Sequence, residues 1–167
     1  MNRLLYWLSG FLPCRLINDG ALPYLERYYV GQAFGRTFYL HRFVASDPAR
    51  GLHDHPWSRA FSIVLSGSYW EETRTGRRHI KWFNALTGDT FHRVILPDGY
   101  GTPGSVWTLF FHGPYVKKWG FLKPVDISHA DGVLMFLPYT YTDRASSGIN
   151  RWWETAPKGK DSGRLPR

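Results

Sequence analysis

A long series of short strand-like segments between residues 36 and 122 constrains this chain more than any other feature. The segments are rich in aromatic and β-branched residues, which favour pleated, half-buried strands. Turn residues separate them, and Gly67 divides two of them so closely that a tight hairpin is expected there. About eight strands at this spacing predict a β-sandwich or barrel. The segments are 36–45, 59–66, 68–74, 78–83, 90–96, 106–112 and 116–122, with a further strand at 133–137.

Helical character is confined to the N-terminal stretch, with residues 22–30 as the other candidate. Residues 4–12 are mostly apolar and follow Arg3, but the stretch is too short to span a bilayer. It also lacks the small residues of a signal-peptide cleavage site. We therefore expect a short helix that belongs to the fold, and no membrane partner.

Composition places the chain among ordinary globular proteins. Its 167 residues suit one domain, and 43% hydrophobic with 20% charged residues excludes a disordered chain. Cys14 is the only cysteine, so no intrachain disulfide can form and a reducing, cytoplasmic location is expected. The formal charge of +8 attracts polyanions, but no known nucleic-acid motif is present, so nucleic acid ranks last among the partners.

We expect the single domain to have three parts. Residues 1–30 form an N-terminal segment that packs on the barrel, and residues 31–140 form the barrel itself. Residues 141–167 form a C-terminal extension, which becomes a basic, mobile tail beyond Thr155.

Three histidines stand where a metal site would need them. His53 and His55 are two apart, and residues i and i+2 of a strand project from one face, so both imidazoles can meet one cation at about 2 Å. Asp54 then faces the other way. His92 follows the turn at Gly88 and begins a later strand, so it brings a third imidazole from a distant part of the chain. Spacing alone is a weak signal, because two surface histidines give the same pattern.

Two segments resemble the motifs of a known family. Residues 51–67 (GLHDHPWSRAFSIVLSG) resemble the first cupin motif, in which a His-x-His pair precedes an acidic residue and, after a hydrophobic strand, a glycine. Residues 88–94 (GDTFHRV) resemble the second motif, in which a glycine turn leads to one more histidine. The resemblance implies an all-β cupin double-stranded β-helix, a jelly-roll barrel, with His53, His55 and His92 as the metal ligands.

The stretch from Tyr24 to Leu122 is also similar to a largely uncharacterised group of small cupin-like proteins in bacteria and their phages. This similarity is specific for the fold and not for the chemistry. Its residues are 23–28 (PYLERY), 40–43 (LHRF), 51–57 (GLHDHPW), 82–84 (WFN), 88–94 and 108–121 (TLFFHGPYVKKWGF).

One position departs from the cupin pattern. The acidic ligand of the first motif should fall near Arg59, and no carboxylate stands there. Three neutral imidazoles would then hold the metal and leave its other positions to water or substrate. Glu71 or Glu72 is an alternative fourth ligand, since one of this adjacent pair must face inward, but such a glutamate can equally pair with an arginine. Iron(II) is the metal we expect first, with zinc, nickel, manganese and copper left open.

Other residues are expected around the ligands rather than among them. His41, His112 and Trp57 are candidates for holding the ligands by hydrogen bonds or for lining a substrate pocket. His79 and His129 stand in polar surroundings and are interpreted as surface residues.

Two functions follow from this site. In the first, the protein is a metal-dependent enzyme, an oxygenase or an isomerase, with a dioxygenase-like oxidoreductase preferred. Its small-molecule substrate would be anionic, because three neutral ligands leave the double positive charge of the metal uncompensated. In the second, the barrel holds a ligand or a structural metal without catalysing a reaction. A homodimer formed through the N-terminal segment is expected by analogy with cupins alone.

Overall fold

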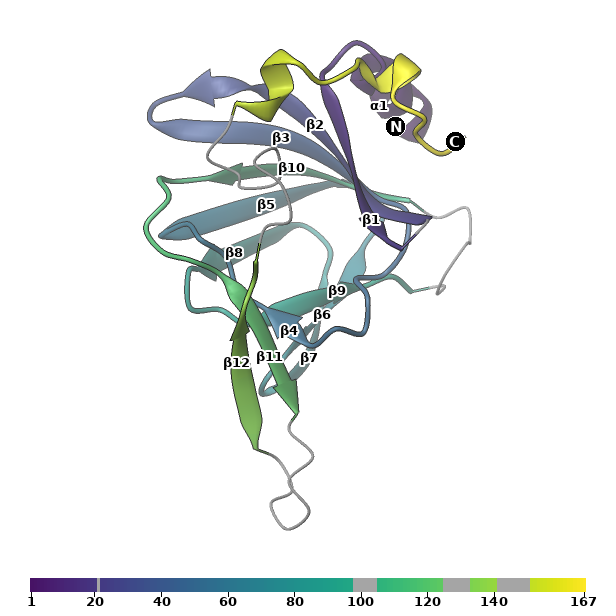
Figure 1. Ribbon diagram of the computed structural model, residues 1–167. Helices are drawn as coiled ribbons and strands as arrows, with labels where there is room; N and C mark the ends of the chain where they lie inside the picture. The colour runs from purple at the N-terminus through teal and green to yellow at the C-terminus, as the bar shows by residue number, and fades with distance from the viewer. Residues whose placement is uncertain (21, 98–104, 125–132, 141–150) are drawn as a thin grey trace.

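Two antiparallel six-stranded sheets face each other in the computed structural model of the chain and form a β-barrel (Figure 1). The structure describes residues 1–20, 22–97, 105–124, 133–140 and 151–167. The first sheet has the order β1-β2-β3-β10-β5-β8 and the second β12-β11-β4-β9-β6-β7. The elements are α1 (Asn2–Ser9), β1 (Cys14–Asp19), β2 (Leu22–Ala33), β3 (Arg36–Phe43), β4 (Leu52–His53), β5 (Arg59–Ser66), β6 (Tyr69–Thr73), β7 (Gly76–Ile80), β8 (Phe83–Thr87), β9 (His92–Ile95), β10 (Val106–His112), β11 (Gly120–Pro124), β12 (Leu134–Pro138), η2 (Trp152–Glu154) and η3 (Gly159–Asp161). The prediction of an all-β fold with one short N-terminal helix is confirmed.

The main core lies between the two sheets, at the end of the barrel where β5 passes into β6. Inward-facing side chains of both sheets meet there, because alternate residues of a strand project to the same face. Burying large apolar side chains of this kind stabilises the fold by roughly 1.5–3 kcal/mol each. The buried members are Leu25, Phe43, Val64, Tyr69, Ile80, Val94, Leu96 and Val106.

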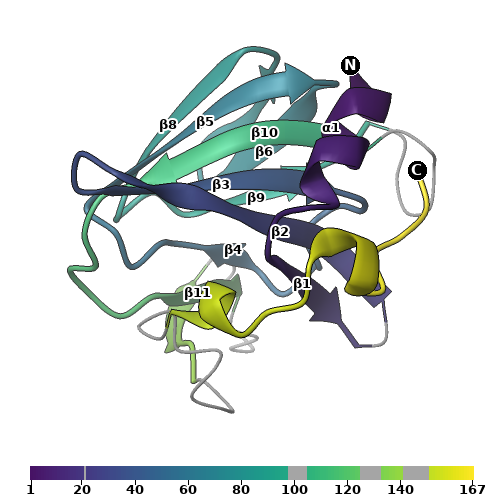
Figure 2. The ribbon, with the colours of Figure 1, turned by 90° about the horizontal axis from the view of Figure 1, so that it is seen from above.

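Helix α1 covers the opposite face of the first sheet. Its Leu5 packs in a second cluster with Tyr28 of β2, Leu40 of β3 and Trp107 of β10. Seen from above, α1 crosses these strands beside the C-terminal segment (Figure 2). Neighbouring residues of β3, such as Tyr39 and His41, point to the interior instead, because of the alternation along the strand.

The region 22–30, which was the second helix candidate, is a strand. β2 pairs with β1 on one side and with β3 on the other. Its buried residues include Leu25, Glu26 and Tyr28. Partner strands on both sides decide against a helix here, because a helix would leave the backbone groups of β1 and β3 without hydrogen bonds.

The hairpin predicted around Gly67 is wrong. β5 pairs with β10 and β8 in the first sheet, whereas β6 pairs with β7 and β9 in the second. Gly67 has a φ of +79° and lies against Val106, so it turns the chain from one sheet to the other. Sequence alone does not distinguish this corner from a hairpin, because both need a glycine between two strands.

The C-terminal residues, which we expected to form a mobile tail, are hydrogen-bonded to the barrel. The amide of Leu165 donates to Oε1 of Glu26 at 2.8 Å, and Arg42 donates to the carbonyl oxygens of Leu165 and Pro166. Nearer the start of this segment, the amide of Gly159 donates to the carbonyl of Leu12 at 2.9 Å. The buried side chains of Glu26 and Arg42 therefore bind the backbone of the last residues and hold them against the barrel.

The N-terminal segment is also more than a covering layer, because it contributes β1 and most of β2 to the first sheet. The expected division at residues 30 and 140 stays a prediction. The strand predicted at 133–137 is present as β12, and the loop residues 141–150 lie outside the described residues. In the part of the chain that the structure describes, no helix has the length and apolar character needed to cross a bilayer.

Candidate metal centre

Three strands of the second sheet bring the predicted histidines together. His53 ends β4 and is paired directly with His92 of β9. On its other side, His53 is paired with Phe121 of β11. We predicted that His53 and His55 lie on one face of the same strand. His53 is in β4, but His55 lies beyond the end of that strand. Pro56 follows His55 and has no amide hydrogen to donate to a strand ladder.

The three imidazoles converge on one point. Each offers one ring nitrogen, and these three nitrogens lie within 4.8 Å of one another. The Nε2 atoms of His55 and His92 are 2.9 Å apart. Two nitrogens bound at right angles to one cation, each about 2.1 Å away, would be about 3 Å apart. The observed separation therefore fits two cis ligands of a single metal ion.

Glu71 determines which nitrogen of His92 faces this point. The fully buried Oε1 of Glu71 lies 2.8 Å from Nδ1 of His92, so Nδ1 carries the proton and Nε2 keeps its lone pair. The same carboxylate accepts hydrogen bonds from Arg78 and Asn84. Burial alone would raise the pKa of Glu71, but the hydrogen bonds that it accepts from His92, Asn84 and Arg78 outweigh this effect and lower the pKa to about 2.

This network shows which of the two adjacent glutamates, Glu71 or Glu72, faces the site. Glu71 faces inward and both its oxygens are occupied by the protein, so it orients a ligand rather than occupying the fourth position itself. Glu72 points away from the site and pairs with Arg77 and Arg93. The carboxylate beside His92 therefore comes from β6, whereas the first cupin motif would have placed an acidic residue near Arg59 at the start of β5.

Two aspartates hold the segment that carries the other two histidines. Asp54 faces away from the cluster, as expected, and accepts hydrogen bonds from Nζ of Lys117 and the amide of Gly120, each at 2.7 Å. Asp47 is largely buried, and its Oδ2 lies 3.9 Å from Nδ1 of His53. Burial raises the pKa of Asp47, against the hydrogen bond it accepts from the amide of Val94. Sequence reasoning missed Asp47, because nothing local connects it with a histidine six residues later.

Burial and neighbouring charges keep His53 and His55 neutral. Burial is the largest cause that lowers the pKa of both His53 and His55 well below its usual range. The positive charge of Arg27 acts in the same direction at both rings, and Arg50 adds to it at His53. A metal needs the unprotonated imidazole, so the donor set fits a divalent cation.

The cluster lies in the wall of a cavity of about 980 Å³. His41, His112 and Trp57 line the same cavity. The indole of Trp57 stacks on His112 with ring centroids 4.0 Å apart and on His55 at 5.2 Å. His41 is buried, and its Nε2 accepts a hydrogen bond from Nε of Arg27 at 3.0 Å. These three side chains shape the surroundings of the cluster and stand outside the group of converging nitrogens.

The cavity wall also carries more positive than negative charge. Four arginines line it, against one described carboxylate, that of Asp47. Arg50 is the arginine nearest in sequence to His53. Its guanidinium lies over the rings of Tyr24 and Phe121, at 5.7 and 5.5 Å, and donates to the hydroxyl of Tyr24. Among the described residues Arg50 makes no ion pair, and its Nε is buried without an acceptor. The arginines are Arg15, Arg27, Arg50 and Arg151.

The remaining predicted histidines are accounted for as far as the structure describes them. His79 is exposed, lies 2.9 Å from the hydroxyl of Ser68 and stacks on Trp70, so it is a surface residue. His129 lies outside the described residues.

No family model matches the chain, and no curated protein matches it by sequence. Solved structures do match. One is a cupin-2 domain protein from Rhodospirillum rubrum, at 10% identity over 69% of this chain and 76% of that chain, with a TM-score of 0.52. Another is a sugar phosphate isomerase from a cupin superfamily, from Silicibacter pomeroyi, at 14% identity over 76% and 88% of the two chains, again with a TM-score of 0.52.

A further match is FeII HppE, at 13% identity and a TM-score of 0.48. It pairs 60% of this chain with 56% of that chain, so the protein spans little more than half the length of HppE. At these levels of identity the likeness concerns the fold. The barrel is a cupin barrel, as the resemblance of the two histidine motifs implied.

Proposed function

We propose that the protein is a metal-dependent cupin enzyme that binds one divalent cation through His53, His55 and His92 and acts on a small anionic molecule in the adjoining cavity. The observation that carries the proposal is the convergence of three imidazole nitrogens within 4.8 Å. The Nε2 atoms of His55 and His92 are 2.9 Å apart, so a proton or a cation must lie between them to prevent repulsion.

Iron(II) is the cation we propose first, with zinc, nickel and manganese as the alternatives to be tested. Imidazole ligands suit several of these metals, so affinity alone does not choose among them. When bound, such a metal supplies a Lewis acid and, in the case of iron, a redox centre. An oxygenase or an isomerase is the reaction class that we propose, and the Silicibacter pomeroyi neighbour named a sugar phosphate isomerase agrees with the second.

The chain's own residues prepare the site in three ways. Glu71 holds the proton of His92 on Nδ1 and keeps the ring in place. His112 donates its Nδ1 proton to the carbonyl of Gly113 at 2.7 Å, and burial lowers its pKa to about 4, so it stays neutral beside the cluster. The indole of Trp57 stacks on both His55 and His112 and so holds these two rings in place in the wall of the cavity.

The charge of the cavity supports an anionic substrate. Arg50 is held between two aromatic rings without a carboxylate partner among the described residues, so its charge is available to a bound anion. An anion placed between Arg50 and a divalent cation at the histidines would interact with both charges. Such charge-assisted bonds are about twice as strong as neutral hydrogen bonds.

The first experiment measures the metal. Protein purified without chelator is analysed for its elements, stripped, and reloaded anaerobically with iron(II), zinc, nickel or manganese. We expect one metal ion per wild-type chain, no binding by His55→Ala, and unchanged binding by His79→Ala, which removes an exposed histidine outside the cluster. Equal metal content in wild type and His55→Ala would refute the site.

A second measurement separates a catalytic from a structural metal. A structural ion should contribute strongly to stability, so that its removal lowers the melting temperature steeply, whereas a catalytic ion contributes less. Metal-dependent turnover in a screen of small carboxylates and sugar phosphates would support the enzyme. Metal binding without any turnover, together with large destabilisation of the stripped protein, would instead favour a non-catalytic cupin module.

A further inference from the structure

Helix α1 carries an apolar stripe on the side that faces away from the barrel. The stripe repeats at the three- and four-residue spacing of one helical face and continues into the turn after the helix. Its side chains are between 44% and 75% exposed, which is unusual for five large apolar residues within one turn-and-helix segment. They are Met1, Leu4, Trp7, Leu8 and Phe11.

The fold does not need this stripe, because the opposite side of α1 already makes the packing contacts. Leu5 is buried against Tyr28 and Trp107, and Ser9 is fully buried. Arg164 lies over the ring of Tyr6 at 3.7 Å and donates to the carbonyl of Tyr6 and the hydroxyl of Ser9. The contacts of Leu5, Tyr6 and Ser9 therefore hold the helix on the barrel, and its apolar outer side is exposed to solvent.

Exposed cations lie on α1 and on the C-terminal segment beside it. The C-terminal segment lies beside α1 in both views (Figures 1 and 2), and the amide of Lys160 donates to the carbonyl of Gly10 at 3.1 Å. Lys158 forms an isolated antiparallel β-bridge with Pro13, which follows the helix and its turn. Among residues 1–13 and 158–167, Asp161 is the one acidic side chain, and it is exposed. The exposed cations are Arg3, Lys158, Lys160 and Arg167.

We propose that this surface, the α1 stripe with its cationic border, binds peripherally to an anionic lipid bilayer. Helices that lie in the plane of a membrane surface combine Trp, Phe and Leu on one side with Lys and Arg at the border, as this one does. Tryptophan in particular prefers the boundary between headgroups and acyl chains. The proposal qualifies our expectation of no membrane partner, which rested on the segment being too short to span a bilayer.

Charge favours a lipid surface over a second copy of the chain. Pairing two α1 stripes about a two-fold axis would bring two sets of lysines and arginines together, and like charges brought together oppose association. An anionic bilayer offers the complementary charge, and each Lys or Arg near it adds to the attraction. The cavity with the histidines lies on the other face of the first sheet, so this proposal does not depend on the proposed function.

The test is co-sedimentation of the full-length protein with vesicles. Vesicles of phosphatidylcholine alone are compared with vesicles containing about 30% phosphatidylglycerol. We expect binding to the anionic vesicles that weakens as salt is added, and at least about tenfold weaker binding to the neutral ones. The double variant Leu4→Ser/Trp7→Ser should lose binding by about tenfold or more, and Lys158→Glu/Lys160→Glu should lose the preference for anionic lipid.

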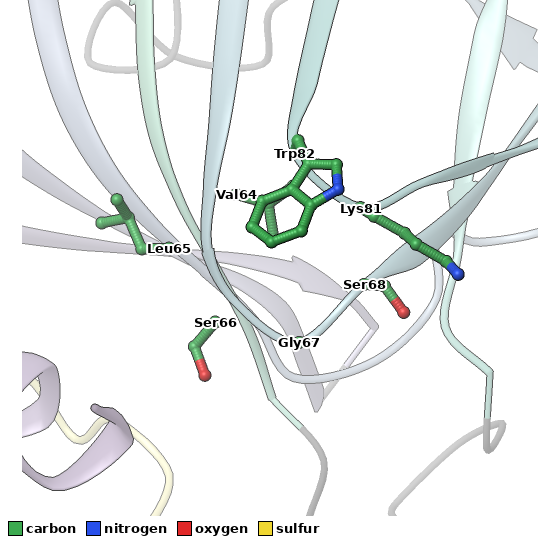
Figure 3. A pocket seen from close by; sticks show the side chains of 7 residues that line it. All are labelled: Val64, Leu65, Ser66, Gly67, Ser68, Lys81 and Trp82. Atoms are coloured by element: carbon green, nitrogen blue, oxygen red, sulfur yellow. The ribbon is translucent and has the colours of Figure 1, made fainter.

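Trp82→Ser is the matched control. Trp82 is 79% exposed, more than Trp7, and lies next to Lys81 at the rim of a hollow of about 360 Å³, far from α1 in sequence (Figure 3). It should bind vesicles like wild type, and melting temperatures confirm that every variant is folded. Failure of wild type to sediment with anionic vesicles would overturn the proposal. So would a dimer in light scattering that dissociates in Leu4→Ser/Trp7→Ser, because the stripe would then be a contact between copies.

Discussion

Glu71 and His92 are diagonal neighbours on the paired strands β6 and β9, with Oε1 of the carboxylate 2.8 Å from Nδ1 of the ring. Neither residue is near the other in sequence, and only strand pairing brings them together. The relationship converts an ordinary histidine into one with a fixed proton position and orientation. Residues that hold a metal-binding histidine in this way contribute measurably to metal affinity.

Replacing Glu71 should therefore weaken metal binding without removing a ligand. For Glu71→Gln we expect metal affinity to fall by about 10- to 100-fold, because the charged acceptor for His92 is lost. Glu72→Gln is the control, since Glu72 is the next residue of β6 but pairs with Arg77 and Arg93 outside the site. Competition with a chromogenic chelator measures both. Similar losses for the two variants would contradict the role of Glu71.

Arg50 should bind the anionic part of a cavity ligand. We expect the metal-loaded protein to bind benzoate more tightly than uncharged benzamide, with Arg50→Gln weakening benzoate binding by about tenfold through the loss of a charge-assisted bond. Arg36→Gln is the matched control, because Arg36 also lies over two aromatic rings, those of Phe61 and Phe111, but outside the cavity. Calorimetric titration distinguishes them. Equal benzoate affinity in wild type and Arg50→Gln would show that the anion binds elsewhere.

Stability should decrease as the pH falls below neutral. Burial lowers the pKa of His112 from 6.5 to about 4, so between these pH values the unfolded chain binds more protons than the folded chain. The contribution of His112 is therefore fully present above pH 6.5 and is lost as the pH falls toward 4, on the order of 3 kcal/mol. His41, whose pKa burial also lowers, acts in the same direction.

Urea denaturation of the stripped protein at a series of pH values measures this effect. His112→Phe keeps an aromatic ring beside Trp57 and removes the titrating group, so its stability should change less between pH 6.5 and 4 than that of wild type. Parallel curves for the two proteins would mean that other groups cause the acid sensitivity.

Gly51 should be required for the position of β4. It has a φ of +102°, and a Cβ atom there would lie 2.2 Å from the carbonyl oxygen of Leu122 in the neighbouring strand β11. We expect Gly51→Ala to lower the free energy of unfolding by more than about 2 kcal/mol and to weaken metal binding, since β4 carries His53. Gly20→Ala is the control, because Gly20 also has a positive φ but no atom lies within 4 Å of the added Cβ. Its free energy of unfolding should fall by about 1 kcal/mol, and its metal binding should not change. Thermal unfolding and metal titration test both variants.

Part of the fold and of the candidate site could be predicted because it depends on local pattern. Strands such as β5 and β10 begin and end where their aromatic and β-branched runs do, since side-chain alternation is a property of the strand itself. The resemblance of the two histidine motifs to those of cupins likewise pointed to the barrel and to His53, His55 and His92.

What the sequence by itself determined, then, is the class of fold and the identity of the three imidazoles that converge. Only the tertiary structure decided that β5 and β6 lie in different sheets, that Glu71 orients His92, and that the C-terminal residues dock on Glu26 and Arg42. The physical reason is that strand pairing and buried hydrogen bonds join residues far apart in the chain. A local pattern specifies which side chains of a segment face inward, but not which distant partners meet them there.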